Sequence, residues 1–268
     1  SSEIAKATSI CKTTVLRILK DNSCFIQPNK YSFQKDFFTS LDTPQKAWMY
    51  GLLLSDGCCY NNRMKLSLHT QVRDVLTKFK NHISFSGPVN TNNKTNSTSI
   101  SIYNKNLVDD LAKHGCVPQK SLIVKFPTTV SDANIRHFIR GYFDGDGCIT
   151  FNSRRNYISI SFKGTFQFVS SLQKYLEKCI DVKGIICKTT STTHNTFDLI
   201  INGNYQAIRF LHYIYDRTEE EIRMDRKYNK SIVLYRRMMK IRKIRQSDSR
   251  LWYSELPENK QADQIDQA

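Results

Sequence analysis

The feature that most constrains the fold of this chain is an internal repeat. The segment AWMYGLLLSDGCCY at residues 47–60 aligns without gaps to HFIRGYFDGDGCIT at residues 137–150. The identical positions pair Gly51 with Gly141, Asp56 with Asp146, Gly57 with Gly147 and Cys58 with Cys148. A helix-start signal precedes each copy, Asp-Thr-Pro at 42–44 and Ser-Asp at 131–132. Two copies of one segment predict a duplicated structural unit.

The same succession of strand and helix patterns follows each copy. Alternating apolar and polar residues predict half-exposed strands at 63–69, 98–103, 157–163 and 196–202. Helical patterns occupy residues 73–83, 105–115, 166–180 and 205–215. The order helix, two strands, helix, two strands, helix therefore occurs twice. It predicts an α+β fold made of two pseudo-symmetric αββαββα half-domains.

These patterns divide the chain into five segments. We expect a helix-turn-helix-like segment at 1–22, a linker at 23–40, half-domains at 41–130 and 131–235, and a basic helix with a disordered tail at 236–268. The first segment has helix-turn-helix spacing, with Ser9 in place of the usual turn glycine. Two interpretations of it stay open, extra DNA contact or an amphipathic helix pair packed on the body. The basic helix is expected to lie against phosphates.

Composition indicates a polyanionic partner. Lys and Arg number 40 against 24 Asp and Glu, which gives a formal net charge of +16. Nucleic acid is the expected partner, with a membrane surface or plain solubility as alternatives. No apolar stretch of about 18 residues and no signal-peptide core occur, so no membrane partner is expected. Eight cysteines without a CxxC pair favour buried thiols in a reducing intracellular compartment over a zinc site or disulfides.

The glycines and acids of the repeat predict a shared site. A glycine inside a helix costs about 1 kcal/mol relative to alanine unless close packing needs it. Gly51 and Gly141 therefore predict two helices that touch backbone to backbone across a pseudo-twofold axis. Each helix would end at Asp56 or Asp146, where the helix dipole is already negative. Two adjacent carboxylates repel, so one tends to stay protonated, and Mg²⁺ would remove the conflict. Phosphodiester hydrolysis uses such an arrangement.

A third acid, Asp144, lies two residues before Asp146. Together they resemble the opening of a calcium-binding EF-hand loop, but Cys148, Ile149 and Arg155 occupy places where that loop needs an oxygen ligand, a glycine and a glutamate. The other repeat copy has Leu54 at the position of Asp144. Asp144 is therefore expected to be a cap or polar contact and not a metal ligand.

The repeat also carries a family resemblance. MYGLLLSDG (49–57) and IRGYFDGDG (139–147) resemble the LAGLIDADG motif, and HGCVPQKSLIVKFP (114–127) and RMDRKYNKSIVLY (223–235) are similar to flanks of phage and intron-encoded members. From about residue 41 to 236 the chain resembles a single-chain LAGLIDADG homing endonuclease. The resemblance implies saddle-shaped antiparallel sheets that bind double-stranded DNA, in a monomer without an obligate protein partner. It also implies hydrolysis of a long target with Mg²⁺, or Mn²⁺ as a substitute, and makes Asp56 and Asp146 the catalytic metal ligands.

Four further residues are candidate helpers in catalysis. Aligning LSLHTQ (66–71) with ISISFK (158–163) puts Gln71 and Lys163 at a strand position where the family keeps a polar residue near the scissile phosphates. Lys120 and Lys227 resemble the family's solvent-network lysines, which would polarise water or offset phosphoryl charge. For any one lysine, plain phosphate contact or a solvated surface is the alternative.

The polar faces of the predicted strands are the expected DNA-reading surface. A two-stranded ribbon fits the major groove, where base edges carry a full donor and acceptor code. The candidates are Arg63, Lys65, Ser67 and His69 in the first half, and Arg154, Arg155, Tyr157, Ser159 and Ser161 in the second. Polar hairpin tips at 88–98 and 187–196 would reach along the duplex. Because the halves differ, the target is expected to be asymmetric.

One alternative function stays open. A protein of the same fold can bind nucleic acid without cutting it, as an intron RNA maturase or a transcription regulator. The presence of both Asp56 and Asp146 favours the nuclease, because a pure binder gains nothing from two repelling acids.

Overall fold

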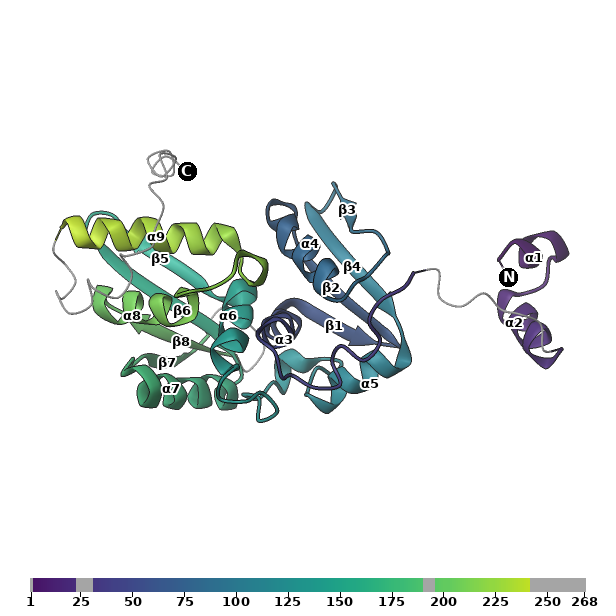
Figure 1. Cartoon of the computed structure of the whole chain (residues 1–268), viewed down its shortest axis with the longest axis horizontal. Coiled ribbons are helices and arrows are strands. Elements are labelled where there is room, and N and C mark those ends of the chain that lie inside the picture. Colours follow the sequence, from purple (N-terminus) through teal and green to yellow (C-terminus); the bar gives the residue numbers. More distant parts are fainter. Residues whose placement is uncertain (1, 23–30, 190–195, 242–268) are drawn as a thin grey trace.

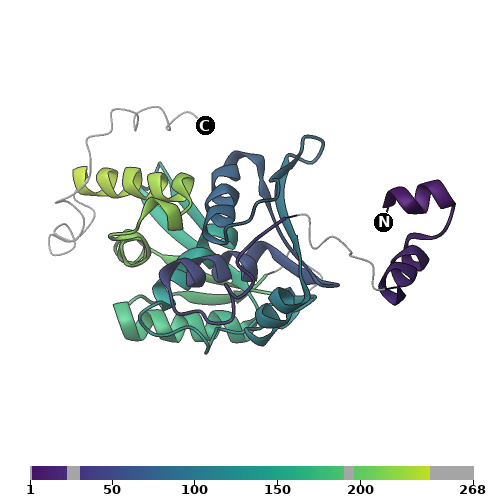
Figure 2. The same cartoon turned by 45° about the vertical axis from the view of Figure 1, so that its right-hand side comes forward.

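The computed structural model describes residues 2–22, 31–189 and 196–241 (Figure 1). The chain starts with α1 (Ser2–Thr8) and α2 (Lys12–Asp21), which lie apart from the rest of the molecule in both Figure 1 and Figure 2. Ser9, between these helices, has a φ of 56°, the left-handed conformation that the usual turn glycine adopts.

The first half follows the predicted order of elements. It comprises α3 (Pro44–Asp56), β1 (Gly57–Tyr60), β2 (Arg63–His69), α4 (Arg73–His82), β3 (Asn90–Asn92), β4 (Ser97–Tyr103) and α5 (Lys105–Lys113). Short 3-10 turns, η1 (Thr70–Val72) and η2 (Lys120–Leu122), follow β2 and α5. The strands form an antiparallel sheet in the order β1-β2-β4-β3. Thr43 caps α3 by accepting a hydrogen bond from the Lys46 amide at 3.3 Å.

The second half repeats this topology. It comprises α6 (Ile135–Asp146), β5 (Cys148–Asn152), β6 (Tyr157–Gly164), α7 (Phe166–Ile180), β7 (Ile185–Lys188), β8 (Phe197–Asn202) and α8 (Asn204–Tyr215). Its antiparallel sheet has the order β5-β6-β8-β7. After it come η3 (Glu220–Ile222) and α9 (Asp225–Lys240). The predicted α+β fold of two αββαββα repeats is confirmed.

Strand burial explains how each half holds together. Met64, Leu66 and Leu68 of β2 are buried, while the residues between them are half-buried or exposed. Strand β6 alternates in the same way. One face of each sheet therefore packs on its helices and the other remains open. The helices α3 and α6 lie against each other between the two sheets (Figure 1). Among the described helices, none is long and apolar enough to cross a membrane.

Two segment boundaries need correction. The linker expected at 23–40 is wrong for residues 31–40, because Phe37 and Phe38 are buried in the core and Tyr31 and Phe33 pack against it. Its remainder, 23–30, lies outside the described residues. The boundary at 235 falls inside α9, where Met238 is fully buried, so residues up to 240 belong to the second half. The expected tail, like most of the hairpin tip at 187–196, lies outside the described residues.

The cysteines also differ from expectation. Of those in the described residues, only Cys59 and Cys116 are buried, with their sulfur atoms 3.5 Å apart. Cys11, Cys58, Cys148, Cys179 and Cys187 are exposed free thiols. Several of them lie on strand positions that face away from the core, a placement that cysteine counting does not predict.

Candidate active site

The two repeat helices touch through their glycines. A Cβ atom placed on Gly51 would lie 2.4 Å from the Phe138 carbonyl oxygen of α6. One placed on Gly141 would lie 2.0 Å from the Trp48 carbonyl oxygen of α3. Both distances are shorter than any Cβ contact tolerates, and both involve backbone atoms. Only glycine permits this approach, and the approach brings the carboxyl ends of α3 and α6 together.

The two acids of the repeat lie at these helix ends. Helix α3 ends at Asp56 and α6 ends at Asp146. A Cβ on Gly145 would lie 2.4 Å from the Asp56 Oδ2 atom, so the end of α6 passes directly beside that carboxyl group. Burial, and then the charge of Asp146, raise the pKa of Asp56 to about 6. Burial also raises the pKa of Asp146, although its side chain still reaches solvent. The two acids thus form one pair that resists double ionisation.

Two buried lysines support the pair symmetrically. Lys120 Nζ donates to the Ser55 carbonyl at 3.1 Å, and Lys227 Nζ donates to the equivalent Gly145 carbonyl at 3.2 Å. Lys227 also donates to the carbonyls of Phe143 at 2.5 Å and Asp144 at 2.8 Å. Each ammonium group therefore binds the negative end of a repeat helix. The positive charges of both lysines oppose the rise that burial causes in the pKa of the two acids, but do not cancel it.

The two lysines differ in the number of carbonyl acceptors that their ammonium groups bind. Burial lowers the pKa of Lys227 to about 8. Its three carbonyl acceptors nevertheless match the three N–H donors of an ammonium group, which favours the charged form. Lys227 is therefore a fixed cation. Within the described part of the chain Lys120 donates to a single carbonyl, so it keeps N–H groups for another acceptor.

Strand register corrects the pairing of Gln71 with Lys163. Cys58 pairs with Lys65 in the first half, and the equivalent Cys148 pairs with Ser161 in the second. Lys65 is therefore equivalent to Ser161, and Ser67, two residues after Lys65, is equivalent to Lys163, two residues after Ser161. The predicted alignment failed because the β1–β2 hairpin turns tightly at residues 61–62, whereas β5 and β6 are longer and turn over residues 153–156.

Of Gln71 and Lys163, only Lys163 lies near enough to Asp146 to affect its pKa. Gln71 lies in η1, beyond the end of β2. Lys163 lies on the open face of β6, and its charge lowers the pKa of Asp146. Lys163 thus belongs with the acid pair, and Gln71 has no such connection.

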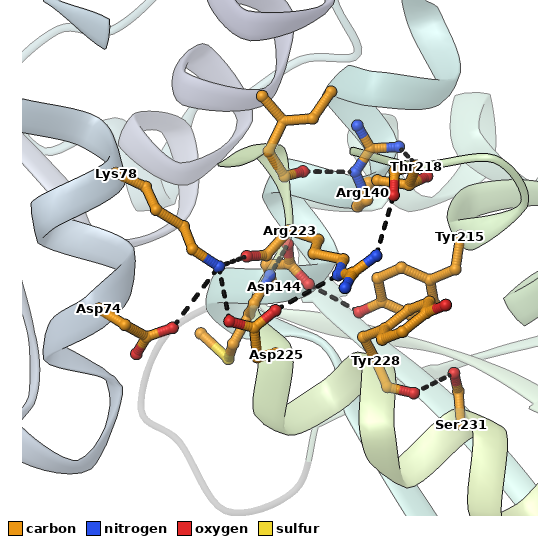
Figure 3. A network of polar contacts seen from close by, with 12 residues as sticks. Asp74, Lys78, Arg140, Asp144, Tyr215, Thr218, Arg223, Asp225, Tyr228 and Ser231 are labelled. Atoms are coloured by element: carbon orange, nitrogen blue, oxygen red, sulfur yellow. Dashed lines mark hydrogen bonds and ion pairs between the residues drawn. The ribbon is translucent and has the colours of Figure 1, made fainter. Parts of the chain in front are cut away.

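Asp144 is held in a buried polar network (Figure 3). Its carboxylate accepts hydrogen bonds from Trp48 Nε1 at 2.9 Å, Tyr215 OH at 2.7 Å and the Met224 amide at 3.0 Å. Next to it, the fully buried Arg140 donates to the carbonyls of Ile214 and Ile222. Asp144 therefore joins α3, α6 and the start of α9, and its side chain is unavailable to a metal. No sequence pattern indicated Trp48 or Tyr215 as its partners.

The predicted DNA-reading residues lie on the open faces of the sheets. Arg63, Lys65, Ser67 and His69 alternate along β2 with buried residues, and Tyr157, Ser159 and Ser161 do the same along β6. Arg154 and Arg155 lie in the turn between β5 and β6. Strand register places further residues on the same two faces that were not among the predicted candidates: Tyr60, Ser99, Ser101, Tyr103, Thr150, Ile185, Ile200 and Asn202.

The donor set at the acid pair fits a divalent cation. Within the described residues, no group of three or more His, Cys, Asp or Glu side chains forms a closed metal site. Two carboxylates at an exposed edge suit Mg²⁺, which keeps several water ligands and binds through one or two carboxylates plus phosphate oxygens. Both acids keep contact with solvent, Asp56 as a half-buried and Asp146 as an exposed residue, so an ion with water ligands can approach them. Asp56 and Asp146 are therefore the residues that would hold the ion.

The raised pKa of Asp56 predicts that its charge destabilises the metal-free protein. The folded-state pKa of about 6 exceeds the usual 3.8, so the stability that this group contributes is present below pH 3.8 and is lost as pH rises through 6. Asp56→Asn should raise the free energy of unfolding by about 1 to 3 kcal/mol at pH 8 and leave it nearly unchanged near pH 4. The upper value corresponds to the full rise in the pKa of Asp56, and the lower one allows for solvent screening. Denaturant unfolding at both pH values measures this.

A matched control for that measurement is Asp42→Asn. The Lys46 ammonium group holds the pKa of Asp42 below its usual value, so the same substitution should give no stabilisation at pH 8. An equal gain from Asp56→Asn at pH 4 and pH 8 would contradict the assignment of the effect to its charge.

Comparison with known proteins gives one family match, over the second half of the chain. Residues 133–215 match a family model described as a LAGLIDADG-like domain. No curated protein gives a significant match to the chain.

Solved structures share the fold over most of the chain. The LAGLIDADG meganuclease I-AabMI, bound to uncleaved DNA, is 13% identical with a TM-score of 0.51 over 75% of this chain and 92% of that one. The LAGLIDADG homing endonuclease I-GzeII, in complex with its DNA target, is 10% identical with a TM-score of 0.50 over 75% and 92%. The N-terminal LAGLIDADG domain of DUF199/WhiA is 15% identical with a TM-score of 0.44 over 70% and 92%. The chain therefore contains a LAGLIDADG-like domain and has the two-repeat fold of the LAGLIDADG meganucleases.

Proposed function

We propose that this protein is a site-specific, metal-dependent double-strand DNA endonuclease of the homing type that acts as a monomer. The observation that carries the proposal is the acid pair. Asp56 and Asp146 come from two repeats, meet at two helix ends, resist joint ionisation and are flanked by two buried lysines. A fold that only bound nucleic acid would not need to keep two repelling acids together.

The residues divide the chemistry between them. A Mg²⁺ ion, or Mn²⁺ in its place, would activate water and stabilise the leaving oxygen when held by Asp56 and Asp146. Lys227, fixed by three carbonyls, keeps positive charge beside the acids and holds the end of α6 in place. Lys120 and Lys163 have donors that can reach a phosphate oxygen and offset the charge that develops on it.

The open strand faces would supply binding. The net charge of +16 gives the chain a general attraction for DNA. Arg63 and Lys65 on β2 have the donors that recognise guanine edges, and Ser159 and Ser161 on β6 adapt to several bases. The two faces differ at most equivalent positions, such as Lys65 against Ser161 and Ser101 against Ile200, which supports an asymmetric target. The exposed free thiols are compatible with a reducing compartment, which we propose as the place of action.

The function can be tested without knowing the target. The protein is incubated with a library of duplexes that carry a long randomised segment, with Mg²⁺ and with a chelator, and the new ends are sequenced. The proposal predicts ends at one recurring asymmetric sequence in Mg²⁺ only. Recovery of a bound sequence that stays intact in both Mg²⁺ and Mn²⁺ would contradict it and would indicate a non-cleaving binder, such as an RNA maturase or a transcription regulator.

Affinity for the recovered duplex should depend strongly on salt. Several phosphate contacts release counterions on binding, so the association constant should fall by about three decades between about 50 and 200 mM salt. Fluorescence anisotropy of a labelled duplex measures this. Lys65→Gln, on the open face of β2, should lower the affinity, whereas Lys105→Gln, which pairs with Asp109 on α5, should not. A flat salt response would show that the positive charge does not face DNA.

A further inference from the structure

We propose that Ile185 and Ile200, on the open face of the second sheet, are specificity residues that contact the methyl groups of thymines. This inference rests on the proposed function, because it assumes that the open strand faces meet the major groove. It goes further by assigning a base preference to two residues that sequence patterns did not connect with recognition.

Register places both isoleucines on the DNA-facing side. Cys148 pairs with Ser161, Ser161 with Ile200, and Ile200 with Ile185, so one row crosses all four strands. Directly paired residues in antiparallel strands point to the same face. Ser161 faces away from the core, and the whole row therefore does so too. The Ile185 side chain is 62% exposed, and neither isoleucine packs against the hydrophobic core.

The first sheet shows that the fold does not require apolar side chains in this row. There Cys58 pairs with Lys65 and Lys65 with Ser101. Lys65 is thus the counterpart of Ser161, and Ser101 is the counterpart of Ile200. A serine satisfies the same strand position, so β-strand packing alone does not explain Ile200.

The surroundings of the isoleucines disfavour a phosphate-binding role for this part of the face. Asp198, two residues before Ile200 on β8, lies opposite Lys163 of β6 in the strand register. Its negative charge offsets the positive charge of that lysine beside the isoleucine row. Lys163 in turn acts on Asp146, so this neighbouring row of Lys163 and Asp198 extends toward the acid pair. The isoleucines carry no charge and no donor for a phosphate, so their row is suited to face the bases.

The chemistry of the major groove then limits what isoleucines can recognise. Among the four bases, only thymine presents an apolar group in that groove, its C5 methyl. Isoleucine has no donor or acceptor in its side chain, so it gains nothing from guanine, adenine or cytosine edges. Covering one methyl group favours thymine over the same base without it by about fourfold.

Uracil in place of thymine tests this, because it removes only the methyl group. Randomised duplex libraries are prepared with thymine or with deoxyuridine throughout, and bound molecules are selected without metal and sequenced. For the wild-type chain, one or two positions in one half of the site should prefer thymine about fourfold each, and the preference should vanish in the uracil library.

Variants assign the effect to the two side chains. Ile185→Ser and Ile200→Ser should each lose a thymine preference while the rest of the selected site stays the same. Ser101→Ile should add a thymine preference in the other half of the site. Selection of one site with no difference between thymine and uracil would overturn the inference and leave the proposed function standing. No selection of any sequence from either library would overturn both.

Discussion

Replacing Gly141 with leucine should slow DNA cleavage about a hundredfold or more, beyond any loss of stability. A Cβ at this position would lie 2.0 Å from the Trp48 carbonyl oxygen, so α3 and α6 must separate to admit any side chain. Overpacking of this kind costs about 1 to 3 kcal/mol. Because Asp56 and Asp146 end these helices, the separation also moves the two carboxyl groups apart. A displacement of about 1 Å at a reacting centre can cost on the order of a hundredfold in rate.

A second destabilised variant separates the two effects. Leu176→Ala empties a fully buried position in α7, away from the helix pair, and should cost about 2 to 5 kcal/mol without moving the acids. Its cleavage rate per folded molecule should stay near wild type. Gly141→Ala, a smaller insertion, should fall between wild type and Gly141→Leu. Normal cleavage by folded Gly141→Leu, or activity found only in a dimer, would contradict the helix interface as the basis of the site.

Asp56→Asn and Asp146→Asn should each abolish double-strand cleavage while binding stays within about tenfold, or 1.4 kcal/mol. Asparagine keeps the shape of the side chain but removes the charge that a divalent cation needs. The open strand faces, which supply affinity, remain intact. Cleavage is followed by gel electrophoresis of the recovered target in Mg²⁺, and binding by anisotropy without metal.

The control for these substitutions is Asp109→Asn. Asp109 is an exposed acid on α5 that pairs with Lys105, and its loss should leave cleavage unchanged. A loss of affinity of about a hundredfold in Asp56→Asn would mean that this acid holds the binding surface together and does not act mainly in cleavage.

The order of the elements could be predicted from the sequence because local patterns determine it. The repeat, the alternating strands and the helix-start signals act over short stretches, and the structure keeps them in the predicted order. The acid pair could also be anticipated, because matching glycines and acids in both repeats indicate two helices that touch and end at one site. Lys120 and Lys227 lie at the ends of the two acid-bearing helices, and their part in catalysis stays a prediction.

What could not be predicted depends on distant contacts. The two hairpins differ in length, which a repeat alignment does not reveal, and Gln71 was therefore assigned to the position that Ser67 holds. Phe37 and Phe38 belong to the core because of residues far along the chain. The partners of Asp144 are likewise set by packing between different helices. Pairing across strands, and not alternation along one strand, places the two isoleucines in one row.

The most direct test of the shared site is a double-mutant cycle on Asp56 and Asp146. Cleavage rates in Mg²⁺ are measured for wild type, for each asparagine variant and for the double variant on the recovered target. Residues that act as one unit lose activity together, so the double variant should be no slower than either single variant. Losses that multiply, or one single variant that still cuts both strands at the normal rate, would show that the two acids do not form one site.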